Sequence, residues 1–484
     1  MAMKSIDTST LSFQELSEIL DNLYLSDPRL RPNPSMHDYQ LTYPPAVLIE
    51  SAPVKHTPTH DQYQKHALGR LRNLALYFHF GFCEYKCRYC HHYEIKTTAK
   101  EAQMSAYVDT MIQEMLNFAS RTTHCRNLIY FLGGGTPTSL PAHLIKKFLL
   151  ALDAYFGKPI SAMSTVEIKP VTASDEKLRL FVEHGFQRIN LGVQTLDPEL
   201  YALHHHGEHL DVSLDAIDRA RRAGYRFINI DILTGIESQT LDAWNRTLQT
   251  IEELIKRDKI DSVFIYPYHD DPRSKTFRNA AALPSTKEVM YSEVLARKMF
   301  ERLGWTELGT RFFRSPRHRR QELKDFMRSR ANPSYGELVY HGFGNSAFSV
   351  GDSASYINHR SIDDYRQAVE TTGLGISNWL VLDDAQRATR DLTFDLLYSP
   401  IVRVRSIAKK YGKASMAAHI QQLEQWAELG LGRWNPVLGI WRLSKLGKLL
   451  HQQMIAALYL EKESLALNEF MTQRLELGRA YRGY

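Results

Sequence analysis

Short apolar runs alternate with helical patterns along the middle of the chain. The runs that read as buried strands are 74–80, 128–133, 164–168, 188–193, 227–233 and 261–267. Between them, apolar residues recur at helical spacing in 101–119, 141–155, 174–184, 211–223 and 240–256. This alternation predicts βαβ units and a parallel sheet, either as an open barrel or as a doubly wound sheet. In both architectures, ligands bind at the carboxyl ends of the strands.

The flanking segments have different patterns. A helical pattern from Leu11 to Leu25 begins with a capping box of Ser12 and Glu15, and a proline-rich stretch that should be extended follows it. Near the C-terminus, a strand-like segment before a last helix is typical of a winged helix. The predicted division is an N-terminal arm (1–70), an α/β domain (71–310), a connecting segment that completes the active-site cover (311–380) and a mainly helical, winged-helix-like domain (381–484).

Composition and charge exclude several classes of protein. The 484 residues are 43% hydrophobic and 24% charged, which is typical of a folded globular chain and not of a disordered one. Neither a long apolar span nor a secretory signal is visible, so we expect a cytoplasmic protein that does not cross a membrane. The net charge of +6 is too small to predict a nucleic-acid partner.

The four cysteines give the sharpest chemical signal. Cys83, Cys87 and Cys90 form a C-x₃-C-x₂-C pattern directly after the first apolar run, whereas Cys125 stands apart as an ordinary thiol. Three thiolates on one loop can bind three irons of a [4Fe–4S] cluster and leave the fourth iron open. The spacing alone leaves two alternatives: three structural cysteines, or a zinc site completed by a nearby histidine. The candidate histidines are His79, His91 and His92.

Glycines or polar residues lie at or next to the ends of the following strands. A glycine-rich segment, Gly133-Gly134-Gly135-Thr136, ends the second run, and such loops let backbone N–H groups approach an anionic or zwitterionic ligand. Glu167, Gln194 and Asp231 lie at the next three strand ends. Because a buried carboxylate is costly unless it is paired, these side chains are expected to face a ligand.

These motifs, in this order, resemble the oxygen-independent coproporphyrinogen III oxidase family of radical S-adenosylmethionine (SAM) proteins. The resemblance runs from Tyr77 through Asp231 and continues more loosely to the C-terminal region. It implies a partial (β/α)₆ barrel of the TIM type, a [4Fe–4S] cluster held by Cys83, Cys87 and Cys90, and one or two molecules of SAM. The residues that it assigns to SAM are Tyr77, Tyr89, Gly133, Gly134, Gly135, Thr136, Glu167, Gln194, His206 and Asp231.

The same resemblance implies the chemistry. One electron, from a donor such as flavodoxin or ferredoxin, would cleave SAM to a 5′-deoxyadenosyl radical. Two departures bear on the subtype. His91-His92 follow Cys90 where porphyrinogen decarboxylases have Gly-Cys, and His206 stands where relatives carry an arginine near a SAM carboxylate. A neutral imidazole cannot make a bidentate carboxylate contact. Either the histidine is protonated, or an arginine of the next helix replaces it, or the second ligand is held differently, or the alignment shifts at this point. The candidate arginines are Arg219, Arg221 and Arg222.

We therefore interpret the sequence as a methyl or methylene transferase that acts on an sp² carbon by methylation or cyclopropanation. In that interpretation His91, His92 and Tyr93 are the catalytic residues, because a histidine transfers protons well near neutral pH. The alternatives are porphyrin-directed chemistry, by oxidative decarboxylation or ring opening, and a heme chaperone without turnover. The substrate would be a small molecule or carrier-bound, and the basic run Arg311–Arg320 would face it if anionic.

Overall fold

The computed structural model describes most of the chain. The described residues are 6–32, 43–50, 52, 58–90, 98–205, 207–268, 282–309, 311–318, 322, 324–325, 338–399, 401–459, 463–465 and 469. In this part of the chain, no helix is long and apolar enough to cross a membrane.

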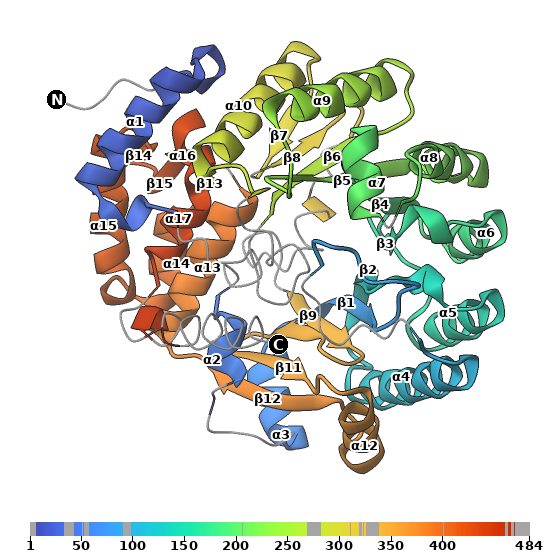
Figure 1. Ribbon diagram of the computed structural model, residues 1–484. Helices are drawn as coiled ribbons and strands as arrows, with labels where there is room; N and C mark the ends of the chain where they lie inside the picture. The colour runs from blue at the N-terminus through green and yellow to red at the C-terminus, as the bar shows by residue number, and fades with distance from the viewer. Residues whose placement is uncertain are drawn as a thin grey trace, which may run out of the picture.

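A curved sheet, parallel at its centre, forms the middle of the molecule (Figure 1). Its central strands are β1 (Asn73–Phe80), β2 (Arg126–Gly134), β3 (Thr165–Ile168), β4 (Arg188–Gln194), β5 (Phe227–Thr234) and β6 (Ser262–Pro267). Each pairs in parallel with the next in sequence order. The intervening helices are α4 (Glu101–Arg121), α5 (Ala142–Phe156), α6 (Asp175–Glu183), α7 (Pro198–His204), α8 (Asp211–Ala223) and α9 (Leu241–Lys256). The predicted strands and helices, and the α/β fold class, are confirmed.

Both sides of this sheet are extended by later strands. Next to β1 lies β9 (Leu338–Phe343), also parallel, and the antiparallel strands β10 (Phe348–Val350), β11 (Ala354–Asn358) and β12 (Ile376–Val381) follow it. Beyond β6 come β8 (Phe312–Arg314) and β7 (Thr306–Leu308). Within the described residues the sheet has twelve strands and stays open between β12 and β7, which defines a partial barrel. Two helices accompany these strands: α10 (Thr286–Arg302) and α12 (Ile362–Thr372).

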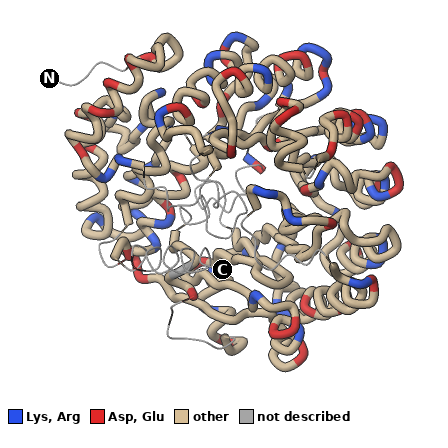
Figure 2. The backbone as a smooth tube through the Cα atoms, viewed as in Figure 1, with Lys and Arg blue, Asp and Glu red and all other residues tan. Residues whose placement is uncertain are grey.

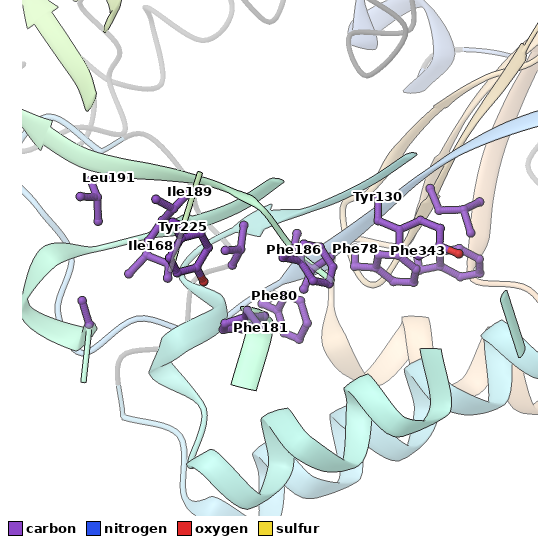
Figure 3. Close-up of a cluster of buried hydrophobic side chains, with 14 of the residues drawn as sticks. Phe78, Phe80, Tyr130, Ile168, Phe181, Phe186, Ile189, Leu191, Tyr225 and Phe343 are labelled. Carbon is purple, nitrogen blue, oxygen red and sulfur yellow. The ribbon is translucent and has the colours of Figure 1, made fainter. Parts of the chain in front are cut away.

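Alternating residues of the strands explain why one face is apolar. Phe78 and Ile189 point toward the outer helices and pack with Phe181 and Phe186 in the main core (Figure 3). Because successive side chains of a strand point to opposite faces, the residues between them line the inside of the barrel. Glu167 lies between Val166 and Ile168 of the core and therefore faces inward. Polar side chains are thus directed to one interior region.

The N-terminal arm and the C-terminal region share a second core. Helix α1 (Phe13–Ser26) begins at the predicted capping box of Ser12 and Glu15, and its apolar side packs against the C-terminal helices. These helices are α13 (Asp384–Tyr398), α14 (Val404–Tyr411), α15 (Ala417–Glu428), α16 (Lys445–Leu449) and α17 (His451–Ala456). A small sheet of β13 (Ile401–Val402), β15 (Ile440–Leu443) and β14 (Gly432–Asn435) accompanies them. One short helix of the arm, α2 (Ala46–Glu50), interrupts the stretch from Pro28 to Pro58 that was expected to be extended, and α3 (His60–Gln62) follows it.

The described part of the basic run from Arg311 is divided between the core, with Arg311, and the surface, with Arg317. Arg311 is 6% exposed and pairs with Glu293 at 2.7 Å, and Arg317 pairs with Asp258. Arg319 and Arg320 lie outside the described residues. Figure 2 shows charges of both signs mixed over the outer helices, with no single basic face in the view. Arg311 and Arg317 therefore form ion pairs within the chain, and contact of the run with a substrate stays a prediction.

Candidate functional site

Two loops meet at the carboxyl ends of β1 and β2. We call residues 83–90 the cysteine loop and residues 133–136 the glycine-rich loop. The backbone N–H of Gly135 donates to the Phe80 carbonyl at 2.6 Å, and that of Thr136 donates to the Phe82 carbonyl at 2.8 Å. The Thr136 hydroxyl lies 3.3 Å from the Cys83 sulfur. The glycine-rich loop therefore supports the start of the cysteine loop.

The thiols of the cysteine loop form one group. None of the three forms a disulfide with another described cysteine; Cys87 is buried, and Cys83 and Cys90 are half-buried. The pKa of Cys83 is raised to about 12, chiefly by burial; Thr136 and Lys169 lower it, and the nearby Cys90 and Cys87 thiols raise it. A neutral thiol is thus favoured until a metal takes the place of the proton.

The donor set fits an iron–sulfur cluster better than a single metal ion. In the described part of the chain, no three His, Cys, Asp or Glu side chains converge to hold one ion. In a cluster each thiolate binds a different iron, so the sulfurs need not converge on one point. Two of the histidines proposed for a zinc site, His91 and His92, lie outside the described residues, and the third, His79, accepts or donates a hydrogen bond at 2.9 Å with Tyr77.

The glycine-rich loop needs its glycines for three different reasons. A Cβ on Gly133 would come within 2.5 Å of the Glu167 carboxylate, so this glycine gives the carboxylate room at the next strand end. Gly134 has a φ of 101°, which few other residues adopt. A Cβ on Gly135 would collide with the Phe82 carbonyl and come within 2.8 Å of that of Phe80.

The other predicted SAM residues gather at the same edge of the sheet. In the pairing of β4 with β5, Gly192 lies opposite Asp231, which accepts a hydrogen bond from Asn229 at 2.7 Å. Gln194 ends β4 with a φ of 69°, an uncommon conformation for a non-glycine residue. Its side-chain nitrogen folds back to within 2.9 Å of where a Cβ of Gly192 would lie. Tyr77 faces the same interior from β1 and stacks on Tyr340 with the ring centres 6.0 Å apart.

Two contacts fix the back of the cysteine loop, and the first is made by residues that the sequence did not single out. Arg88 donates to Glu237 in a forked ion pair with a shortest distance of 2.7 Å. The half-buried Tyr89 ring lies beside the imidazoles of His204 and His205, at ring distances of 6.2 and 6.1 Å. Burial, followed by the Cys87 thiol, raises the pKa of Tyr89 well above its usual value.

Several predicted residues do not join the site, or cannot be placed in it. His91, His92, Tyr93 and His206 lie outside the described residues, so their assigned roles stay predictions. The arginines of α8 that could have replaced the missing arginine pair elsewhere. Arg219 and Arg222 pair with Asp215, and Arg221 pairs with Asp261, directly before β6 and thus at the opposite end of the sheet. Cys125 precedes β2, also at that end.

Comparisons with known proteins agree with this geometry. The radical SAM superfamily matches residues 77–251, from the end of β1 to α9. The chain is 26% identical to the heme chaperone HemW of Bacillus subtilis over 392 residues, which is 79% of this chain and 98% of the chaperone. It is also 26% identical to the oxygen-independent coproporphyrinogen III oxidase of Pseudomonas aeruginosa over 387 residues, 76% of this chain and 83% of the oxidase.

A solved structure has the same fold. Coproporphyrinogen III oxidase (HemN) from Escherichia coli superimposes with a TM-score of 0.74 and 22% identity, covering 87% of this chain and 96% of the oxidase. Residues 77–251 thus match the radical SAM superfamily, and the site lies within them. Over most of its length the chain is similar to HemN/HemW proteins, the oxygen-independent coproporphyrinogen III oxidase-like proteins.

Proposed function

We propose that this protein holds a [4Fe–4S] cluster with Cys83, Cys87 and Cys90, binds SAM beside it, and acts on or carries a tetrapyrrole. The observation that carries the proposal is the contact between the two loops, where the Thr136 hydroxyl lies 3.3 Å from the Cys83 sulfur. This contact puts the thiols next to a loop whose glycines and neighbouring Glu167 suit a zwitterionic ligand. When bound, such a cluster supplies one electron to SAM, and the protein's part is to orient SAM and exclude water.

The tetrapyrrole is proposed from the relatives. The chaperone and the oxidase that match most of the chain are named for heme and for coproporphyrinogen III. Neither is named for the transfer of a methyl or methylene group, so the transfer to an sp² carbon that the sequence suggested is the second candidate. The observation that favours this second candidate is His91-His92 after the third cysteine. The family resemblance leads us to expect a further cysteine there in an enzyme that decarboxylates porphyrinogens.

One anaerobic experiment separates these functions. The full-length protein is reconstituted with iron and sulfide, then incubated with SAM, a reductant and either coproporphyrinogen III or heme. We expect formation of 5′-deoxyadenosine that depends on the tetrapyrrole, or stoichiometric heme binding without turnover if the protein is a chaperone. The absence of both, together with S-adenosylhomocysteine and a methylated product from another substrate, would contradict the tetrapyrrole proposal and support transfer.

A further inference from the structure

Lys169 is a buried lysine beside the thiol site with no hydrogen-bond partner among the described residues. It directly follows β3, two residues after Glu167, and is 8% exposed. Its Nζ atom is inaccessible to solvent, and no described residue forms a hydrogen bond with it. A buried ammonium group is costly unless an anion compensates it, so its position needs an explanation.

Lys169 is held in place at both its ammonium group and its backbone. Its Nζ lies over the ring of Tyr85, 2.8 Å from the ring centre, and Tyr85 belongs to the cysteine loop. The backbone is fixed as well, because the Lys169 carbonyl accepts hydrogen bonds from the N–H of Thr172 at 2.9 Å and from its hydroxyl at 2.8 Å. The Tyr85 hydroxyl in turn donates to Glu208, so the ring that supports the lysine is also anchored.

The charge of Lys169 lies at the cysteine loop. Its Nζ is placed over Tyr85, which lies between Cys83 and Cys87 in sequence, and a cation beside groups that become anions stabilises the anions. The other cation of this loop with a described ion pair, Arg88, is already matched by Glu237 at 2.7 Å. Lys169 is therefore a cation at this site whose charge no carboxylate within hydrogen-bond distance offsets in the described chain.

We propose that Lys169 is a positioning residue that supplies the counter-charge of the cysteine loop. Held on the face of Tyr85, its ammonium group offsets the negative charge that the thiolates of Cys83, Cys87 and Cys90 bring into this buried site when they bind metal. This inference rests on the proposed cluster. A nearby positive charge favours the reduced, more negative state of a cluster, so Lys169 raises the reduction potential and helps the protein to retain iron.

The test compares three variants of the full-length protein after anaerobic reconstitution. Lys169→Met removes the charge and keeps the length, and Lys169→Arg keeps the charge. Lys177→Met is the matched control, because Lys177 is a half-buried lysine of α6 whose Nζ donates to the Thr138 carbonyl at 2.6 Å. Iron content and the midpoint potential, followed by electron paramagnetic resonance without SAM, are measured for each, and SAM affinity is measured by calorimetry.

We expect the midpoint potential of Lys169→Met to shift to more negative values, or its iron content to fall, while Lys169→Arg and Lys177→Met stay near wild type. A wild-type potential and iron content in Lys169→Met would overturn the inference. Equal losses of iron or equal shifts of potential in Lys169→Met and Lys169→Arg would also overturn it, because they would indicate a role of side-chain shape. A loss of SAM affinity alone would overturn it too, because it would assign the lysine to the SAM carboxylate. If the wild-type protein itself retains no four-iron cluster, the proposed function fails instead.

Discussion

The hydroxyl group of Thr136 lies 3.3 Å from the sulfur of Cys83 and joins the glycine-rich loop to the cysteine loop. The two residues are far apart in sequence; Cys83 lies three residues after the end of β1 and Thr136 two residues after the end of β2. Because β1 and β2 pair in register up to His79 with Gly133 and Phe80 with Gly134, the two loops must leave the sheet side by side. The sheet register therefore builds the site, and several predictions can be derived from this arrangement.

Two glycine substitutions should separate the support of the loops from the binding of SAM. In Gly135→Ala the new methyl group would meet the backbone carbonyls of Phe82 and Phe80, so the loops must move apart. We expect a loss of about 1–3 kcal/mol in the free energy of unfolding, together with poor iron retention. In Gly133→Ala the methyl group meets side chains and no backbone: the end of Glu167, at 2.5 Å, and the edge of the Phe131 ring, at 3.3 Å. Its stability should be near wild type while SAM binds about tenfold more weakly, a difference of about 1.4 kcal/mol.

Denaturant unfolding and SAM titration check this pair. Equal behaviour of the two variants in both measurements would contradict the different roles given to the glycines.

The ion pair between Arg88 and Glu237 should stabilise the cysteine loop specifically. Arg88→Ala removes a forked, charge-assisted contact to a buried carboxylate, and we expect a loss of about 1–3 kcal/mol and faster loss of iron. Arg246→Ala is a matched control, because Arg246 also pairs a half-exposed guanidinium with a buried carboxylate, that of Asp197, at 2.6 Å. Iron release to a chelator is the measurement. Equal rates of iron release from both variants would contradict a specific effect of the Arg88–Glu237 ion pair on the cysteine loop.

The contribution of Glu114 to the free energy of unfolding should fall as the pH rises from about 4.5 to about 7. This residue of α4 is fully buried, and burial raises its pKa from 4.5 to about 7, although Tyr365 donates to it at 2.6 Å. Between these values the unfolded chain ionises while the folded chain keeps the proton. The contribution is therefore fully present below about pH 4.5 and lost by about pH 7, a change of about 3 kcal/mol.

Urea unfolding of the metal-free protein from about pH 5 to pH 8 measures this dependence. Glu114→Gln, which cannot ionise, should flatten the decline between these values. A variant that declines as steeply as wild type would assign the pH dependence to other groups.

Much of the fold could be predicted from the sequence because it depends on local patterns. The strands of the parallel sheet are short apolar runs, and Ser12 with Glu15 marks the start of α1. The pairing of β9 with β1 could not be predicted, since it joins segments more than 250 residues apart whose register no local pattern fixes. The packing of α1 on the C-terminal helices is non-local in the same way.

The candidate site shows the same division. The cysteines and the glycine-rich segment have spacings that carry chemical meaning, so they could be found. Lys169 and Glu237 could not, because a lysine or glutamate after a strand usually faces solvent, and only the folded chain buries these two. The prediction for Arg311 was wrong in the opposite sense. Its basic neighbours suggested that it faces a substrate, whereas it is buried and paired with Glu293.

The central claim is that Cys83, Cys87 and Cys90 together hold a four-iron cluster with one iron left open for SAM. Mössbauer spectroscopy of the anaerobically reconstituted protein, with and without SAM, tests it most directly. The account predicts four irons per chain, one of which changes its spectrum when SAM is added, in wild type and in Cys125→Ala. A single metal ion per chain, or a complete four-iron spectrum in Cys87→Ala, would contradict it.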